Sequence, residues 1–281
     1  MTSIKPLQDA PTHSYSLSIV TVVYNDKEGL RRTYQSLKSQ PTLDYQWIII
    51  DGVSTDGTVE LIMSLDHPSL DWISEEDAGI YDAMNKGAER SHGKYLLFLN
   101  AGDEILPLAF AKLHEDLIST ASLTINTYAT VVHGPNNSDD YFFSNPGKLE
   151  SYMSVYHSST IIPKQFFTEL RGYNLAYSLA SDYDLLLRAR LRNFPFQAFD
   201  NALSRYHRGG ASDRRLIQSR LEAIFSLWAN NSPAKLSGTF ISLRNLIYSI
   251  YPPRRYLPGR VYRTCQSVKR QFMLMSRHPK S

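Results

Sequence analysis

Short apolar runs that alternate with helical patterns fill the first hundred residues, and this alternation limits the possible folds more than any other feature. The runs are rich in Val, Ile, Leu and aromatic side chains and lie within 17–26, 47–52, 70–76 and 94–100. Between them, apolar side chains recur at helical spacing, as at Leu30, Tyr34 and Leu37. Strands with unbroken apolar character are typical of parallel sheets covered by helices on both faces. The sequence therefore predicts an α/β fold with a mostly parallel, Rossmann-like central sheet.

The pattern is less regular after Pro107. It predicts, in order, a helix, a strand, a turn-rich surface loop, a strand, a short helix and an amphipathic helix, near 108–118, 123–132, 133–148, 159–162, 163–170 and 182–192. From residue 216 the pattern is helical, with breaks at Pro233, Pro252 and Pro258. These changes divide the chain into three predicted parts, 1–105, 106–215 and 216–281.

The third part carries a strong excess of positive charge. No Asp or Glu follows Glu222, whereas ten Lys or Arg residues do, and residues 1–222 hold 20 basic and 27 acidic side chains. The net charge of +3 is therefore the sum of a body of −7 and an extension of +10. Such an asymmetry predicts contact with an anionic surface, either a membrane or a nucleic acid.

The compartment is predicted from two further features. The single cysteine, Cys265, excludes an internal disulfide framework and fits a reducing environment. Residues 1–14 are polar and lack the apolar run of a signal peptide, and no stretch has the length of a membrane span. We therefore expect a cytoplasmic location.

Polar residues follow the predicted strands, where open parallel sheets bind their ligands. They are Tyr24 and Asn25, Asp51, 75–77 and 100–103. Carboxylates repel phosphate groups, so a phosphate ligand at this edge needs a helix N-terminus or a divalent cation as intermediary. Because no glycine-rich fingerprint follows the first strand, the sequence disfavours both a dinucleotide site and a P-loop.

Five segments carry a family resemblance in family order: SIVTVVYND, IIIDGVSTDGT, DAGIYDAMNKGAERSHGKYLLFLNAGDE, RGYNLAYSLASDYDLLLRA and YHRGGAS. Together they resemble the inverting, metal-dependent glycosyltransferases of family 2, which have the GT-A fold. GIYDAMNKG is most similar to the subgroup that builds bacterial exopolysaccharides of the colanic-acid type. The resemblance implies that 1–105 is the half that binds a nucleotide sugar, that 106–215 is the acceptor-binding half, and that 216–281 is a basic helical extension.

The resemblance implies a donor site made by the first half. Asp51 matches the residue that hydrogen-bonds the base of the nucleotide sugar, which is usually uracil, although guanine is compatible. The alternative is that Asp51 caps the following turn. Tyr24 and Asn25 would flank the base, and Asp77 would lie near the ribose. Lys86 would either reach the diphosphate from its helix or be a solvated lysine.

The segment FLNAGDE takes the place of the family's D-x-D element, which binds Mg²⁺ or Mn²⁺. The sequence departs from that pattern, because Asn100 and Gly102 replace acidic residues and Asp103 alone remains. One carboxylate suffices where substrate phosphates and water complete the octahedron. In YHRGGAS, the resemblance makes His207 a further metal ligand or a hydrogen-bond donor to the diphosphate, and Arg208 a counter-charge to phosphate.

The segment ASDYDLLLRA resembles the family's EDYDLWLR element, whose first Asp is the general base that deprotonates the acceptor hydroxyl. The matching residue is Asp182, and the start of a helix favours its ionised form. Asp184 competes for this role, and Asp182 would otherwise be a helix N-cap. His157 is expected either to line the acceptor groove or to be buried.

The resemblance points to an acceptor saccharide on a polyprenyl-diphosphate carrier at the inner face of the plasma membrane. The basic, apolar segment 240–281 would then lie on anionic lipid as a peripheral contact, unless it is only a solvated helical face. No nucleic-acid motif accompanies the charge, so nucleic acid is disfavoured. The predicted function is sugar transfer from a nucleotide-diphosphate sugar. The alternatives are a nucleotidyltransferase, although YNDKEGLRR is a poor phosphate loop, and a catalytically degenerate GT-A protein that binds saccharide or a partner.

Overall fold

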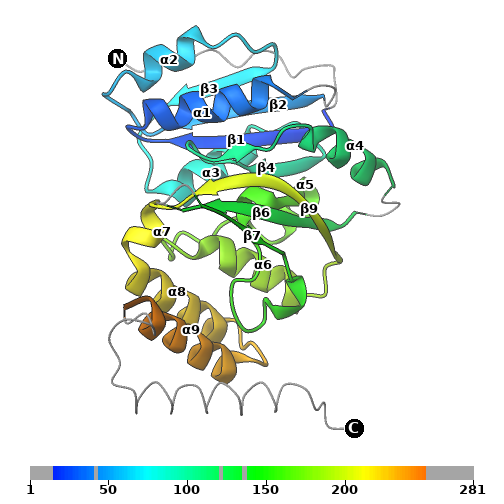
Figure 1. Cartoon of the computed structure of the whole chain (residues 1–281), viewed down its shortest axis with the longest axis vertical. Coiled ribbons are helices and arrows are strands. Elements are labelled where there is room, and N and C mark those ends of the chain that lie inside the picture. The colour runs from blue at the N-terminus through cyan, green and yellow to red at the C-terminus, as the bar shows by residue number, and fades with distance from the viewer. Residues whose placement is uncertain (1–14, 41–43, 120–122, 135–137, 251–281) are drawn as a thin grey trace.

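The computed structural model describes residues 15–40, 44–119, 123–134 and 138–250 and has an α/β fold (Figure 1). The described strands are β1 (Leu17–Val23), β2 (Tyr45–Asp51), β3 (Leu70–Ser74), β4 (Tyr95–Phe98), β5 (Glu104–Ile105), β6 (Ile125–His133), β7 (Asp139–Phe142), β8 (Thr160–Pro163) and β9 (Phe196–His207). They form one sheet in the order β3-β2-β1-β4-β8-β6-β9-β5, with β7 paired to β6.

The helices are α1 (Lys27–Lys38), α2 (Thr58–Ser64), α3 (Ile80–Glu89), α4 (Ala109–Ser119), α5 (Lys164–Glu169), α6 (Ser181–Leu191), α7 (Ala211–Arg214), α8 (Leu216–Ala229) and α9 (Lys235–Ile250). Two 3₁₀ turns, Pro146–Lys148 and His157–Ser159, lie in the second half. No helix in the described ranges is long and apolar enough to cross a membrane.

The parallel part of the sheet is the part that the apolar runs predict. Strands β3, β2, β1 and β4 are parallel, and β8 then pairs antiparallel with β4. Successive side chains of β1 enter different cores. Val20 and Val22 pack with α3, whereas Ile19 and Val23 pack with α1. Burial on both faces explains why the run contains no solvent-facing polar alternation.

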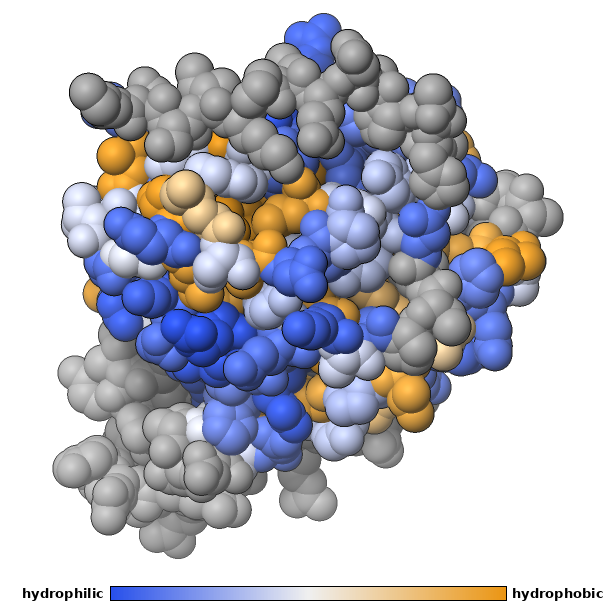
Figure 2. Space-filling model, turned by 90° about the horizontal axis from the view of Figure 1, so that it is seen from above, coloured by the Kyte–Doolittle hydropathy of each residue, from blue (hydrophilic) through white to orange (hydrophobic). Residues whose placement is uncertain are grey.

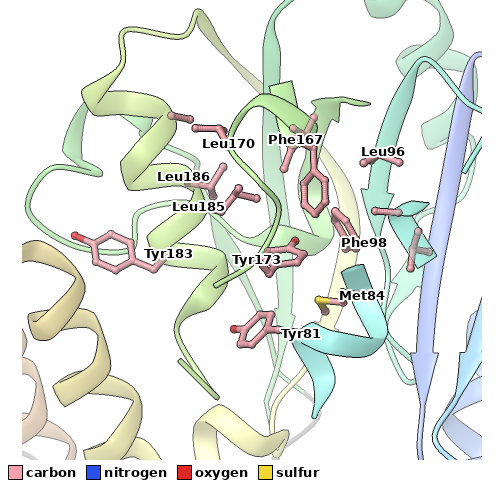
Figure 3. Close-up of a cluster of buried hydrophobic side chains, with 14 of the residues drawn as sticks. Tyr81, Met84, Leu96, Phe98, Phe167, Leu170, Tyr173, Tyr183, Leu185 and Leu186 are labelled. Atoms are coloured by element: carbon pink, nitrogen blue, oxygen red, sulfur yellow. The ribbon is translucent and has the colours of Figure 1, made fainter. Parts of the chain in front are cut away.

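An aromatic core joins the parallel strands to the second half of the chain (Figure 3). Phe98 of β4 packs between Phe167 and Tyr173, with ring centroids 5.3 and 4.9 Å away. Tyr173 also contacts Tyr81 of α3, at 5.2 Å between centroids. This chain of rings holds α3 and the segment before α6 in fixed relation to the end of β4.

Two parts of the second half differ from the prediction. The segment 133–148 is not entirely a surface loop, because β7 within it pairs with β6. The twelve-residue β9 was not predicted either. Strand β7 is largely exposed and most residues of β9 are only partly buried, so both lack the continuous apolar run that identifies the buried strands.

Gly93 offers a test of the packing between β1 and the turn before β4. A Cβ at Gly93 would lie 2.4 Å from the backbone nitrogen of Ser18 and 2.5 Å from the carbonyl carbon of Leu17. We expect Gly93→Ala to lower the free energy of unfolding by about 1–3 kcal/mol, measured by denaturant titration. Gly147→Ala is the control, because its nearest neighbour would be 3.4 Å away. Equal stability of the two variants would contradict this packing.

Candidate active site

A cleft of about 880 Å³ opens at the carboxyl ends of β1 and β4. Its walls are the loops that follow these two strands, the first turns of α3 and α6, the 3₁₀ turn at His157 and the segment 206–215. Segments that are far apart in the sequence therefore meet beyond the carboxyl ends of the parallel strands, where open sheets bind their ligands.

Seven of the nine predicted site residues line this cleft, namely Tyr24, Asn25, Asp77, Asp103, Asp182, His207 and Arg208. Lys86 does not. Its ammonium group bonds the Glu76 carbonyl at 2.7 Å and pairs with Glu75 at 2.9 Å and Asp82 at 3.4 Å. The side chain is thus already engaged by carboxylates of its own neighbourhood.

Asp51 is fully buried beneath the cleft at the end of β2. Its Oδ2 accepts hydrogen bonds from the Ser54 amide at 3.0 Å and the Ser74 hydroxyl at 2.6 Å. Asp51 therefore does cap the following turn. Its Oδ1 is buried and has no hydrogen-bond partner in the described structure, which is costly unless a ligand supplies a donor.

Asp103 sits in a turn tied to α1. The Thr33 hydroxyl donates to the Asp103 carbonyl at 2.7 Å and accepts from the Gly102 amide at 3.1 Å. Gly102 has φ +97°, so this turn disfavours a side chain at the position where an acidic residue was expected. Asn100, the other departure from the acidic pattern, contacts His157 at 3.2 Å between Nδ2 and Nε2. Both substituted positions therefore have local structural roles.

Asp103 is 5% exposed, and burial raises the pKa of its carboxyl group to about 7. The charge of Glu104 also raises the pKa, whereas the charge of His157 and a hydrogen bond from the His207 backbone lower it. Asp103 therefore takes up a proton more readily than an exposed carboxyl group, and a nearby cation would oppose this shift.

The described residues form no complete set of metal ligands around Asp103. No three His, Cys, Asp or Glu side chains are grouped to hold a metal ion within the described residues. The His207 imidazole pairs with Glu104 through Nε2 at 2.5 Å and packs on His133. Asp103 is a hard oxygen donor, and such sites are completed by water and substrate phosphates in Mg²⁺ enzymes.

Asp182 lies in the first turn of α6 at the centre of a hydrogen-bond cluster. Its Oδ1 accepts from the Tyr81 hydroxyl at 2.9 Å and the Tyr183 amide at 2.8 Å, and its Oδ2 lies 3.4 Å from Nδ1 of His157. Burial acts to raise the pKa of Asp182. The hydrogen bond and charge of His157, with the other two hydrogen bonds, outweigh burial and lower it.

His157 lines the cleft and is partly buried, with 19% of its side chain exposed, beside Asp182 and close enough to Asp103 to interact with its charge. Burial acts to lower its pKa, but the hydrogen bond and charge of Asp182 and the charge of Asp103 raise it above its ordinary value. The imidazole therefore tends to carry a positive charge beside the ionised carboxylate of Asp182. The sequence did not decide whether His157 lines a groove or is buried in the core. Its position beside Asp182 and Asn100 follows only from the fold.

Asp184 points away from the cleft. It is 2% exposed and accepts hydrogen bonds from Arg188 at 2.7 Å and from Ser226 and Asn230 at 2.9 Å each. Its carboxylate thus joins α6 to α8. Of the two competing carboxylates, Asp182 alone lines the cleft.

Four arginines line the cleft: Arg32, Arg208, Arg214 and Arg215. None of them forms an ion pair with a carboxylate in the part of the chain that the structure describes. Only Arg208 belongs to a segment with a sequence signal. Arg32 has the pattern of an ordinary helix surface residue, and Arg214 and Arg215 belong to no recognisable motif. Together they offer positive charge to an anionic ligand.

Solved glycosyltransferase structures share this architecture. Staphylococcus aureus TarS 1–349 in complex with UDP-GlcNAc has a TM-score of 0.59, with 14% identity over 75% of this chain and 66% of that chain. The mannosyltransferase PcManGT of Pyrobaculum calidifontis, in complex with GDP-Man and Mn²⁺, has a TM-score of 0.63, with 11% identity over 94% and 81%. These likenesses confirm the predicted fold, and the protein has the GT-A fold.

Comparison with protein sequences shows the family to which the chain belongs. The family model for Glycosyl transferase family 2 matches residues 18–171, and the chain belongs to that family. An uncharacterised glycosyltransferase of Mycobacterium tuberculosis (strain CDC 1551 / Oshkosh) is 28% identical over 64% of this chain and 71% of its own length. A PGL/p-HBAD biosynthesis glycosyltransferase of Mycobacterium bovis (strain BCG / Pasteur 1173P2) is 27% identical over 61% and 68%. The family prediction is confirmed, and the closeness to the colanic-acid subgroup stays a prediction.

The raised pKa of Asp103 predicts a pH-dependent stability. Its carboxyl group titrates near pH 7 when folded and near 3.8 ordinarily, so its stabilising contribution is complete below about pH 4 and is lost as pH rises through 7. We expect the unfolding free energy of Asp103→Asn, relative to the wild type, to grow between pH 4 and 8 by roughly 4 kcal/mol at most. Thermal unfolding with a metal chelator measures this difference. A difference independent of pH would show that the carboxyl group is not desolvated.

Proposed function

We propose that the protein transfers one sugar from a nucleotide-diphosphate sugar, by default a UDP-sugar, to a lipid-linked saccharide with inversion at the anomeric carbon. One observation carries the proposal: a single cleft brings together Asp103, at the end of β4, and Asp182, at the start of α6. Inversion needs a base on the acceptor side and charge stabilisation on the side of the leaving diphosphate. Residues 1–105 would form the donor half and 106–215 the acceptor half.

The donor base would be bound by Asp51. Its unpartnered Oδ1 supports this role, because an imide N–H of uracil or guanine would supply the missing hydrogen bond. Tyr24, which is 67% exposed at the cleft, offers a ring face to the base, and Asp77 would contact the ribose. Asn25 accepts a hydrogen bond from the Thr55 amide at 2.8 Å and so positions the loop beside the base. TarS with UDP-GlcNAc and PcManGT with GDP-Man support a nucleotide-sugar donor in this fold.

Asp103 would hold Mg²⁺ or Mn²⁺, with His207 as a further ligand or as a hydrogen-bond donor to the diphosphate. The Mn²⁺ complex of PcManGT supports a cation in this fold, as does the buried carboxyl group of Asp103. When bound, the cation neutralises charge that develops on the leaving diphosphate. Arg208 would add counter-charge to the same phosphates. Lys86 would reach the diphosphate only if its ion pairs with Glu75 and Asp82 broke.

Asp182 would accept the proton of the acceptor hydroxyl. The acceptor oxygen forms its bond to the anomeric carbon while the bond from that carbon to the diphosphate oxygen breaks on the opposite face. The lowered pKa keeps Asp182 ionised at neutral pH, and Tyr81 and His157 orient its carboxylate. A base that starts ionised and in place needs no rearrangement before the proton moves.

The acceptor would be a saccharide on a polyprenyl diphosphate at the inner face of the plasma membrane, in bacterial surface polysaccharide biosynthesis. The support is the excess of basic residues after Glu222, which suits anionic lipid at 240–281. Residues 240–250 belong to α9, and 251–281 lie outside the described residues. Family membership argues against a nucleotidyltransferase, and the cleft-lining Asp103 and Asp182 argue against a degenerate binding protein.

Calorimetric titration tests the donor site. We expect one of UDP and GDP to bind the wild type tightly only with Mn²⁺, and this binding to weaken at least about tenfold in Asp103→Ala. Glu115→Ala is the control, because Glu115 is an exposed carboxylate on α4 outside the cleft. No binding of either nucleotide under any condition would overturn the proposed function.

Asp182→Asn tests the base. We expect kcat to fall by roughly 10²–10⁴ with nucleotide affinity unchanged, because only proton transfer is lost. Asp184→Asn should instead lower the free energy of unfolding by about 3 kcal/mol, because Arg188 loses its charge partner while remaining largely buried. Transfer assays and denaturant titration on both variants separate the two effects. A larger loss of kcat in folded Asp184→Asn than in Asp182→Asn would reverse the assignment.

A further inference from the structure

Helices α8 and α9 carry large apolar side chains that the described structure leaves exposed. Their exposed fractions lie between 43% and 73%. On each helix they are spaced by three or four residues, so they form one stripe along the helix. These side chains, which we call the α8–α9 apolar face, are Ile217, Leu221, Phe225, Trp228, Leu236, Phe240, Leu243 and Ile247.

The two stripes lie on neighbouring helices, on sides that the rest of the described chain leaves uncovered. Trp228 of α8 donates a hydrogen bond to the Thr239 hydroxyl of α9 at 3.0 Å, which holds the helices together. The opposite sides of both helices are already used. Leu227 is fully buried, and a Cβ at Gly238 would lie 2.3 Å from the Ser151 carbonyl oxygen. Figure 1 shows α8 and α9 side by side at the lower end of the described chain, beyond α6.

Basic residues border this face, and carboxylates do not oppose them. Lys235 and Arg244 lie on α9, and no Asp or Glu follows Glu222 in the whole sequence. Glu222 itself is occupied, because it accepts hydrogen bonds from the Leu179 amide at 2.7 Å and the Ser178 hydroxyl at 2.9 Å. An apolar stripe with basic edges matches the apolar interior and anionic headgroups of a lipid bilayer.

The face also begins at the rim of the cleft. Ile217, its first member, follows Arg214 and Arg215, which line the cleft. A surface that rests on lipid at this point holds the cleft entrance at the level of the headgroups. An acceptor embedded in the same bilayer would then reach Asp182 without leaving the membrane.

We propose that the α8–α9 apolar face is the surface by which the protein binds an anionic membrane, with its apolar side chains inserted among the lipid headgroups. The benefit to catalysis rests on the proposed lipid-linked acceptor, but the binding does not. A second copy would be a poorer occupant, because a symmetric contact of this face sets basic edges against each other. Residues 251–281 would also be a poor occupant of this face, because their eight Lys or Arg residues and lack of acidic residues would repel its basic edges.

Vesicle flotation of the full-length protein tests the proposal, without donor or acceptor. The probe is vesicles of phosphatidylglycerol and phosphatidylethanolamine, compared with vesicles of phosphatidylcholine. Phe225→Gln/Leu236→Gln removes two side chains of the face that are 64% and 73% exposed. Met63→Gln/Ile118→Gln is the matched control, because these residues are 67% and 70% exposed on α2 and α4. Figure 2 shows that the end carrying α2 has hydrophobic residues in separate patches among hydrophilic ones.

We expect the face variant to lose at least about tenfold of the partition coefficient onto anionic vesicles, and the control to change less than about twofold. Quenching by brominated lipid should be strong in the wild type. Trp228 is 45% exposed, whereas Trp47 and Trp72 are at most 9% exposed, so quenching reports insertion of α8. Denaturant titration of both variants verifies that each is folded.

Unchanged vesicle binding by the face variant would overturn the proposal and assign any binding to residues 251–281. The proposal would also be overturned if the wild type formed a dimer, the face variant were monomeric and neither bound vesicles. That result would assign the face to contact with a second copy. Failure of the proposed function has a different signature. In that case vesicle binding depends on the face as expected, but no nucleotide binds.

Discussion

The antiparallel pairing of β8 with β4 is the constraint on which the cleft depends. Because the two strands run in opposite directions, the start of β8 lies beside the end of β4. The 3₁₀ turn that precedes β8 therefore delivers His157 to Asn100, which follows β4. His157 also meets Asp182 at the start of α6. One strand pairing thus connects the loop that carries Asp103 with the helix that carries Asp182.

The cleft keeps two carboxyl groups in different states by giving them different neighbours. Desolvation dominates at Asp103 and favours its neutral form, whereas hydrogen bonds and the charge of His157 favour ionised Asp182. Separation of this kind is common where two acids have different tasks. A group that gains from a nearby cation and a group ready to accept a proton are the pair that the proposed reaction requires. Arginines around the cleft add the positive charge that an anionic donor needs.

The sequence predicts the strands whose own side chains reveal whether they are buried. The run containing Val20 and Val22 is apolar because both faces are covered, and that property is local. Strand β9 depends on partners far away in the chain, and its polar side chains give no sign of them. The same distinction holds in the site. Strand ends identified Asp103, but the buried network that occupies Asp184 and the acidic surroundings of Lys86 exist only after folding.

Glu222 does not line the cleft, but it hydrogen-bonds the backbone of Leu179, which does. Its carboxylate accepts from the amides of Leu179 and Ala180, immediately before the helix of Asp182. A carboxylate on α8 therefore fixes the register between α8 and α6. One inserted residue early in α8 would rotate Glu222 by about 100° and carry it away from these amides. Substitutions on the outer side of α8 leave this register unchanged, whereas a change of length before Glu222 would loosen the cleft wall at Leu179.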